Sequence, residues 1–230
     1  MILIMKQFFS LLFVLSIMVG TQSCSGVKGG GLAGLAGLSP TQALGGVQAL
    51  LGGASASALK GFSGNILQNP VIQGVMPKGL STMTGLLGKT ADGAKALDLL
   101  NGAMASAVPD VATSLLGDAT QGIAATHALN LLKGGDTGAT DFLKKSAGDN
   151  LTKALLPVMT QQLTANGGLA AITSALGPQA ATVLGGGNAS IANLATSGAV
   201  DGLFAIMGNA EKAERANPTD PVLKEIFGKK

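Results

Sequence analysis

From Ser39 to the C-terminus, apolar residues recur every three or four positions, which is the spacing of one face of an α-helix. The clearest stripes lie at Ala43–Leu51, Ala94–Ala107, Ile123–Leu132, Leu151–Met159 and Ile191–Met207. Glycine, proline and short polar runs separate them. The pattern therefore predicts an all-α fold, an irregular bundle of roughly eight helices that forms one domain over residues 39–230.

Prolines and small polar residues predict where several of these helices begin and end. Ser39 is a suitable N-cap, and Pro40 fits the first helical position after it. Proline lacks the N–H that a helix interior needs. Pro109 is therefore expected to open a new helix after Ala94–Ala107, and Pro157 is expected to kink its helix or end it.

The same signals place the shorter segments. Residues 69–77, with two Xaa-Pro pairs, are predicted to form a loop before a short helix at Leu80–Leu87. Thr90 or Asp92 is expected to cap the helix that follows. Gly185–Asn188 reads as another loop.

The C-terminal part is predicted to hold one long helix and one short helix. Ser190 is expected to cap the long helix, and Asp220-Pro221 to start the short one. The charged segment Glu211–Arg215 ends the long helix. It is interpreted as solvent-exposed surface, because charged residues are seldom fully buried.

Polar residues are most closely spaced in residues 131–159, which read LLKGGDTGATDFLKKSAGDNLTKALLPVM. Lys133 followed by two glycines is a typical helix end. Asp136 and Thr137 are N-cap types for the next helix, and Asp141 falls in its first turn, where the helix dipole favours an anion. Asp141 also precedes Lys145 by four residues, the better order for an ion pair on a helix.

The candidate site residues come from this segment: Asp136, Thr137, Thr140 and Asp141, a polar motif expected at one end of the bundle. Asp136-Thr137-Gly138 also matches the signature triplet of aspartic proteases. That chemistry needs two carboxylates that share a proton, on loops of a β-rich fold. The flanks here are helical in pattern and the triplet occurs once, so helix capping is the preferred interpretation.

Two other patterns resemble functional sites, a phosphate-binding loop and a metal-binding histidine, and both interpretations are rejected. Gly88-Lys89-Thr90 resembles the end of a phosphate-binding loop, but the glycine that the motif needs five residues earlier is Met83. His127, the single histidine, is expected at the edge of the core, because it lies four residues from both Ile123 and Leu131. It has no metal-ligating neighbours in sequence, so no cofactor or metal is expected.

Composition narrows the class further. Hydrophobic residues make up 47% of the 230 residues, enough for a sizeable core, whereas aromatic residues make up 3%. Such a core suits closely packed helices better than a β-sandwich. The net charge is +3 and no basic stripe with interleaved aromatics occurs, so nucleic-acid binding is not expected. One cysteine excludes an internal disulfide.

The first residues have the features of an export signal. Residues 1–23 contain Lys6 and then the apolar run Phe8–Val19, which is too short for an ordinary membrane-spanning helix. Cys24 follows directly, an arrangement that resembles a bacterial lipoprotein signal, although Thr21 stands where an aliphatic residue is usual. Residues 24–38 are glycine-rich and are interpreted as a tether.

The preferred interpretation is that Cys24 is lipidated, with acyl chains such as palmitate anchoring the protein in a membrane. Ser25 is compatible with sorting to the outer membrane, so a periplasm-facing location there is preferred over the inner membrane. The alternative is an ordinary secretory signal with an incidental cysteine near its end.

Three landmarks together resemble one bacterial family of unknown function, DUF4197. They are LLKGGDTGATD at residues 131–141, the LLPV that follows at residues 155–158, and DGLF at residues 201–204 with the closing LKEIFG at residues 223–228. The resemblance covers the chain from about Leu38 to the C-terminus. It implies an all-helical fold and export, often with a lipid anchor, and it implies no activity, cofactor or catalytic residue.

The sequence thus predicts a lipid-anchored cell-envelope protein that binds a partner or packs against the membrane without catalysis. The expected partners are the membrane, through Cys24, and an envelope protein or apolar ligand. The alternative is a periplasmic carrier that holds a lipid or another apolar ligand between its helices. The third possibility is a hydrolase that uses Asp136, Asp141 or His127.

Overall fold

The computed structural model describes residues 35, 37–184 and 188–228. The signal segment, Cys24 and most of the tether lie outside the described residues, as does most of the loop predicted at Gly185–Asn188. Leu35, within the segment predicted as a tether, is 2% exposed and belongs to the hydrophobic core.

The described residues form an all-α fold, as predicted, with no β-strand among them. The helices are α1 (Pro40–Gly61), α2 (Pro70–Val75), α3 (Lys78–Leu87), α4 (Ala91–Gln121), α5 (Ala125–Lys133), α6 (Gly138–Ala165), α7 (Gly168–Leu176), α8 (Ala180–Leu184), α9 (Asn188–Ala216) and α10 (Pro221–Phe227). Two short 3₁₀ turns, η2 (Ile66–Gln68) and η3 (Gly177–Gln179), complete the set.

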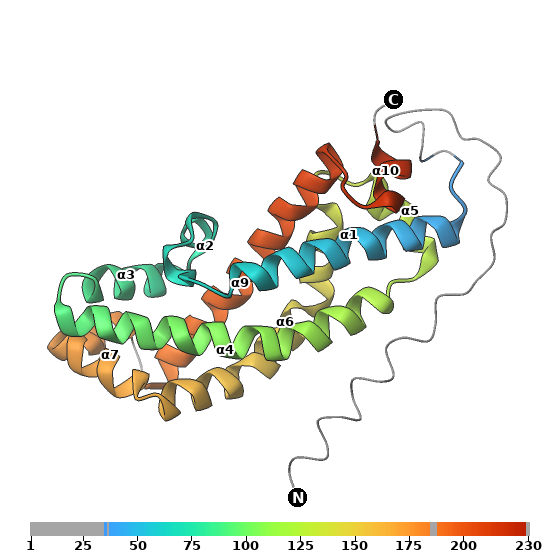
Figure 1. Cartoon of the computed structure of the whole chain (residues 1–230). Coiled ribbons are helices and arrows are strands. Elements are labelled where there is room, and N and C mark those ends of the chain that lie inside the picture. Colours follow the sequence, from blue (N-terminus) through green and yellow to red (C-terminus); the bar gives the residue numbers. More distant parts are fainter. Residues whose placement is uncertain (1–34, 36, 185–187, 229–230) are drawn as a thin grey trace, which may run out of the picture.

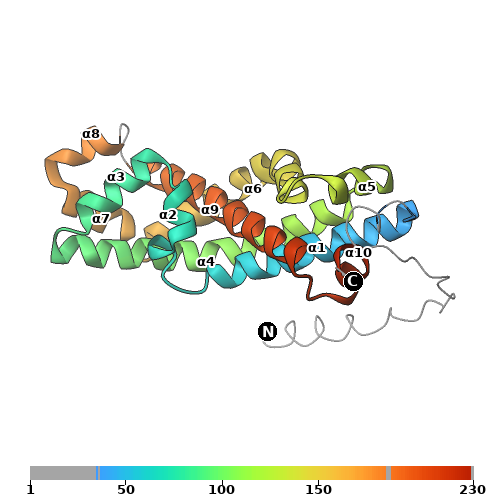
Figure 2. The same ribbon diagram turned by 90° about the horizontal axis from the view of Figure 1, so that it is seen from above.

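The four long helices α1, α4, α6 and α9 form an elongated body (Figure 1). The start of α1 lies at one end of this body with α5 and α10, and α3, α7 and α8 lie at the other end (Figures 1 and 2). Helix α9 runs through the body and packs against α1, α2 and α6. It therefore reaches both the centre of the core and the α5–α6 turn.

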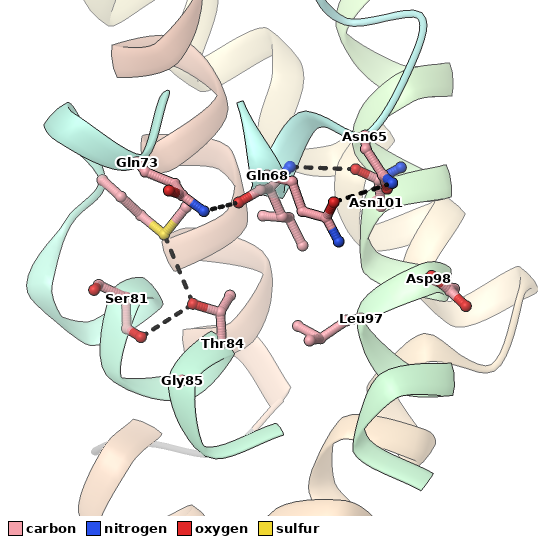
Figure 3. Close-up of a pocket in the computed structure, with 11 residues that line it drawn as sticks. Asn65, Gln68, Gln73, Ser81, Thr84, Gly85, Leu97, Asp98 and Asn101 are labelled. Carbon is pink, nitrogen blue, oxygen red and sulfur yellow. Dashed lines mark hydrogen bonds between the residues drawn. The ribbon is translucent and has the colours of Figure 1, made fainter. Parts of the chain in front are cut away.

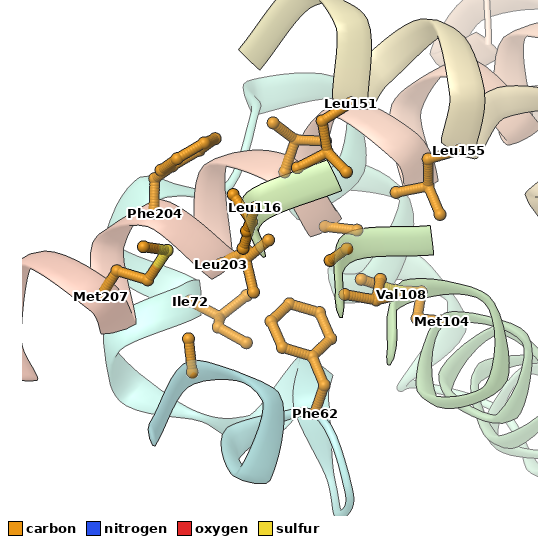
Figure 4. Close-up of a cluster of buried hydrophobic side chains, with 14 of the residues drawn as sticks. Phe62, Ile72, Met104, Val108, Leu116, Leu151, Leu155, Leu203, Phe204 and Met207 are labelled. Carbon is orange, nitrogen blue, oxygen red and sulfur yellow. The ribbon is translucent and has the colours of Figure 1, made fainter. Parts of the chain in front are cut away.

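Leucine, isoleucine, alanine and methionine fill the core, as the low aromatic content requires. Figure 4 shows one part of it, a cluster that includes Phe62, Ile72, Leu203 of α9 and Met104 of α4. These four side chains are fully buried. Burying a side chain of this size contributes about 1.5–3 kcal/mol, so such contacts hold the long helices together.

Two predicted helix breaks do not occur. Pro109 lies inside α4 and Pro157 lies inside α6. Each proline faces partly or fully outward, and the residues whose carbonyls lose an N–H partner, Ala105 and Lys153, are at least partly exposed to water. Buried residues occur on both sides of each proline, so packing of the apolar face stabilises the helix across the proline.

Other boundaries differ in smaller ways. The predicted loop at residues 69–77 contains the short helix α2, with Asn69 as its N-cap. Helix α9 begins at Asn188, so Ser190 lies inside its first turn and is not the cap. The caps predicted at Ser39, Thr90 and Asp220 are confirmed, and each side chain accepts a backbone N–H.

Helix α9 is the one helix in the described part of the chain with the length and apolarity to cross a membrane. Its segment Ser190–Ala216 has a mean hydropathy of 1.3 in the best window, and 67% of that window is buried inside the protein. A mostly buried central helix of a globular domain has the same properties.

Candidate functional site

The polar motif lies in the turn between α5 and α6 and in the first turn of α6. Thr137 occupies the N-cap position of α6, but its side chain caps no backbone N–H. Instead its Oγ1 donates a hydrogen bond to Oδ2 of Asp141, 2.9 Å away. The prediction that the side chains of Asp136 or Thr137 cap α6 is therefore wrong.

The cap comes from Glu211, more than 70 residues later in the chain on α9. The N–H of Ala139 donates to one carboxylate oxygen at 3.0 Å, and the N–H of Thr140 donates to the other at 2.7 Å. Glu211 is completely buried. A fixed negative charge at a helix N-terminus satisfies the amides that the helix itself leaves without partners and complements its dipole.

Arg215, one turn further along α9, neutralises that buried carboxylate. Its Nε and Nη2 donate to Oε1 of Glu211 at 2.9 and 2.7 Å. The same guanidinium donates through Nη1 to the carbonyl of Leu132 at 2.7 Å and through Nη2 to that of Leu131 at 2.8 Å. Arg215 also lies over the ring of Phe227, with 5.2 Å from Cζ to the ring centre.

Glu211 and Arg215 together form what we call the α9 clamp. The clamp binds the last carbonyls of α5 through Arg215 and the first amides of α6 through Glu211. The clamp thereby provides hydrogen-bond partners for backbone groups at two helix ends that meet at a tight turn. Each clamp charge is compensated by the other, which a buried charge requires.

The prediction that Glu211–Arg215 is exposed surface is wrong for these two residues, because Glu211 is completely buried and the Arg215 side chain is 10% exposed. The sequence did contain a signal. Met207, Glu211 and Arg215 follow one another at intervals of four, so both charges continue the buried face of α9.

Close packing and one exposed ion pair also join α9 to the α5–α6 turn, and we call this region the junction. A Cβ placed on Gly208 of α9 would lie 3.2 Å from Cγ2 of Thr137, so glycine allows α9 to approach the turn. Asp136 pairs with Lys212 at 3.3 Å, and both side chains are mostly exposed. Thr140 is 2% exposed, and its hydroxyl has no hydrogen-bond partner among the described residues.

Two of the four motif residues line a shallow groove beside α2. Thr137 and Asp141 form one wall, and Val71, Val75 and Phe204 supply apolar surface, around a volume of about 390 Å³. The expected ion pair between Asp141 and Lys145 does not form among the described residues, and Asp141 accepts a hydrogen bond from Thr137 instead. The structure thus brings the motif together around the clamp and leaves Asp136 and Asp141 facing solvent.

His127 lies on the exposed side of α5, in a second groove of about 440 Å³. Its ring stands 6.3 Å from that of Phe142, which is consistent with the edge of the core. Ser146 lines the same groove, but its hydroxyl donates to the carbonyl of Leu143 at 3.2 Å. No group of three or more His, Cys, Asp or Glu side chains in the described ranges is placed to hold a metal ion.

Two more hollows lie elsewhere on the surface. One, of about 430 Å³, runs between α1 and α4 and is lined mainly by small and apolar residues such as Gly52, Ala56, Leu59 and Ala112. The other, of about 410 Å³, lies between α3, α4 and the turn η2 (Figure 3). Each of the four hollows is open to solvent.

Comparison with known proteins gives one match. The model of a family described as a protein of unknown function (DUF4197) matches residues 37–228. No curated protein and no solved structure matches the chain.

Proposed function

The chain belongs to the DUF4197 family, as the sequence landmarks suggested, and from that premise we propose that it is a lipid-anchored, non-enzymatic binding module of the bacterial cell envelope. The helical domain presents surface grooves to partners, and Cys24 holds the domain at a membrane. The α9 clamp keeps two helix ends in place, so that the surface of the bundle has a fixed shape.

One observation carries the non-enzymatic part of this proposal. The strongest polar groups near the motif, those of Glu211 and Arg215, have their hydrogen-bonding capacity taken up by each other and by helix ends. A catalytic acid or nucleophile needs access to substrate. Glu211 has none, because it is completely buried.

The export and anchoring part is supported by the sequence. A positive residue, an apolar run of twelve residues and then a single cysteine are the features of a lipoprotein signal. The glycine-rich stretch after Cys24 gives the domain reach from a membrane surface. A free thiol would be a liability in an oxidising compartment, whereas an acylated cysteine is not.

The test is the intact mass of the protein from the membrane fraction of a Gram-negative host, beside a Cys24→Ser variant. The proposal expects a chain that begins at residue 24 and carries acyl chains, and a variant that lacks them and leaves the membrane fraction. A soluble wild-type chain without acyl groups would refute the anchor.

The groove between α1 and α4 favours a second candidate function, a carrier of a lipid or other apolar ligand. Its lining is mainly apolar and small, so an acyl chain could lie along it. Native mass spectrometry of protein released from the membrane separates the two functions. A lipid that stays bound, and is lost in Ala56→Gln, supports the carrier, whereas an unliganded mass argues against it.

The hydrolase alternative is tested by replacing Asp136, Asp141 and His127 together with alanine. All three are exposed, so the variant is expected to fold. The proposal predicts that any cellular phenotype of a deletion strain is complemented by this variant as well as by the wild-type gene. A loss of complementation by a stably expressed variant would revive a catalytic role.

A further inference from the structure

A polar pocket far from the motif has the character of a small-ligand site. It lies between α3, α4 and the η2–α2 segment, and its volume is about 410 Å³ (Figure 3). Binding sites for small ligands have volumes of about 300–1,000 Å³. The wall is rich in carboxamides, from Asn65, Gln68, Gln73 and Asn101.

One side of the pocket is held rigid by Asn101 of α4. Its Oδ1 accepts hydrogen bonds from the N–H of Ile66 at 2.7 Å and of Leu67 at 3.4 Å, and its Nδ2 donates to the carbonyl of Gly64 at 3.0 Å. Gln73 adds a bond from Nε2 to the carbonyl of Leu67 at 3.0 Å. The turn η2 is therefore fixed before any ligand arrives, which reduces the ordering cost of binding.

Several polar atoms on the wall remain available after these bonds are made. Gln73 uses its Nε2 and keeps Oε1, whereas Gln68 accepts a long bond from Asn65 on Oε1 and keeps Nε2. No hydrogen bond or ion pair involves the hydroxyl of Ser81 or the carboxylate of Asp98 in the described part of the chain. The wall thus offers both acceptors and donors.

The charge and the apolar surface of the pocket restrict the ligand. Asp98 is the one ionisable residue of the lining, so anionic ligands are disfavoured. Asp98 is exposed at the rim, where water screens its attraction for a cation. Leu97 points from α4 toward Thr84 (Figure 3), and Met76 also lines the pocket, so the pocket also has apolar surface.

We propose that this pocket binds an uncharged sugar that carries hydroxyl and acetamido groups. Sugar hydroxyls donate and accept, as the free atoms of Gln73, Ser81 and Gln68 require. An acetamido group offers one N–H to a free carboxamide oxygen such as that of Gln73, and one carbonyl to a free carboxamide N–H such as that of Gln68. The C–H face of the sugar ring can lie on Leu97. The inference rests on the proposed binding role and gives it a ligand class.

The probe is the disaccharide of N-acetylglucosamine, titrated into the full chain with Cys24→Ser in detergent. Isothermal titration and NMR are expected to give saturable binding with a Kd of about 1 mM or tighter. The disaccharide should shift amide signals of residues 65–68 and 97–101. Titration without saturation would overturn the proposal.

A pair of glycine variants tests whether the sugar binds in this pocket. Gly85 lines it, and a Cβ there would meet no other atom within 4 Å, so Gly85→Leu should occupy ligand space without a clash. Gly45 on α1 is equally open and lies outside the pocket, which makes Gly45→Leu the matched control. We expect at least a tenfold weaker affinity for Gly85→Leu alone, with Tm not lowered in either variant.

Equal affinities in the two variants would place the sugar elsewhere and overturn the proposal. The sugar titration does not depend on acylation, because it uses the Cys24→Ser chain. Failure of the sugar site and failure of the membrane anchor are therefore separate results.

Discussion

Removal of the buried carboxylate in Glu211→Ala is the perturbation with the largest expected effect. It leaves the N–H groups of Ala139 and Thr140 without their acceptor, and it leaves the guanidinium of Arg215 uncompensated. Breaking a buried ion pair from one side costs about 3–5 kcal/mol. For a domain of this size, each kcal/mol lowers Tm by about 2–4 °C, so a decrease of about 6–20 °C is expected.

The assay is thermal and urea unfolding of Glu211→Ala, Arg215→Ala and the double variant, with circular dichroism to check helix content. The two single changes remove parts of one interaction. The destabilisation of the double variant is therefore expected to be about 1–3 kcal/mol smaller than the sum of the single effects.

The matched control is the same cycle on the Asp136–Lys212 pair at the same junction. This pair has side chains 69% and 64% exposed, and exposed pairs contribute about 0.2–1 kcal/mol. If Glu211→Ala lowered Tm no more than Asp136→Ala does, the clamp would be no more important to stability than a surface ion pair.

Three further changes are expected to act through local packing and hydrogen bonds. Gly208→Val should destabilise the domain by about 1–3 kcal/mol in urea unfolding, because its side chain meets Thr137 at the junction, whereas Gly117→Val, in open space on α4, should have a much smaller effect. Pro157→Ala should raise Tm, because it restores an N–H for the carbonyl of Lys153 within α6; a lowered Tm in the thermal scan would show that the proline is needed there. Asn101→Ala should cost about 1–3 kcal/mol in urea unfolding, because two backbone N–H groups of η2 lose their acceptor, and an unchanged midpoint would contradict the role given to this side chain.

The predictions that the structure confirms rest on local interactions. The all-α class follows from the period of the apolar residues, and the caps at Ser39, Thr90 and Asp220 each need a partner only two or three residues away. Such features are encoded in a short window of sequence. They could be predicted without knowledge of the rest of the chain.

The wrong predictions each depend on distant parts of the chain. Pro109 and Pro157 are tolerated because neighbouring helices bury the faces of α4 and α6 on both sides of the proline. The sequence predicts Glu211 and Arg215 to be surface residues because charged residues are seldom fully buried. Their burial depends on helix ends that lie 71 to 84 residues away.

The side chains of the polar motif do not have the capping role that the sequence predicts. Asp136 and Thr137 have the chemistry of caps, and a cap is needed at that position. Glu211, which supplies the cap, lies 71 and 72 residues from the amides that it binds, so no local pattern indicates this role. One neighbouring groove is lined by α2, α6 and α9 and the other by α4, α5 and α6, and a linear pattern does not specify how these helices pack.

Helix α9 supplies the hydrogen-bond acceptors for the first amides of α6, and amide hydrogen exchange at Ala139 and Thr140 measures this contact. Amides in the first turn of a helix ordinarily exchange fast, because the helix gives them no acceptor. With Glu211 in place they are predicted to exchange as slowly as interior amides of α6, and to lose that protection in Glu211→Ala. Fast exchange of both amides in the wild-type protein would contradict the clamp.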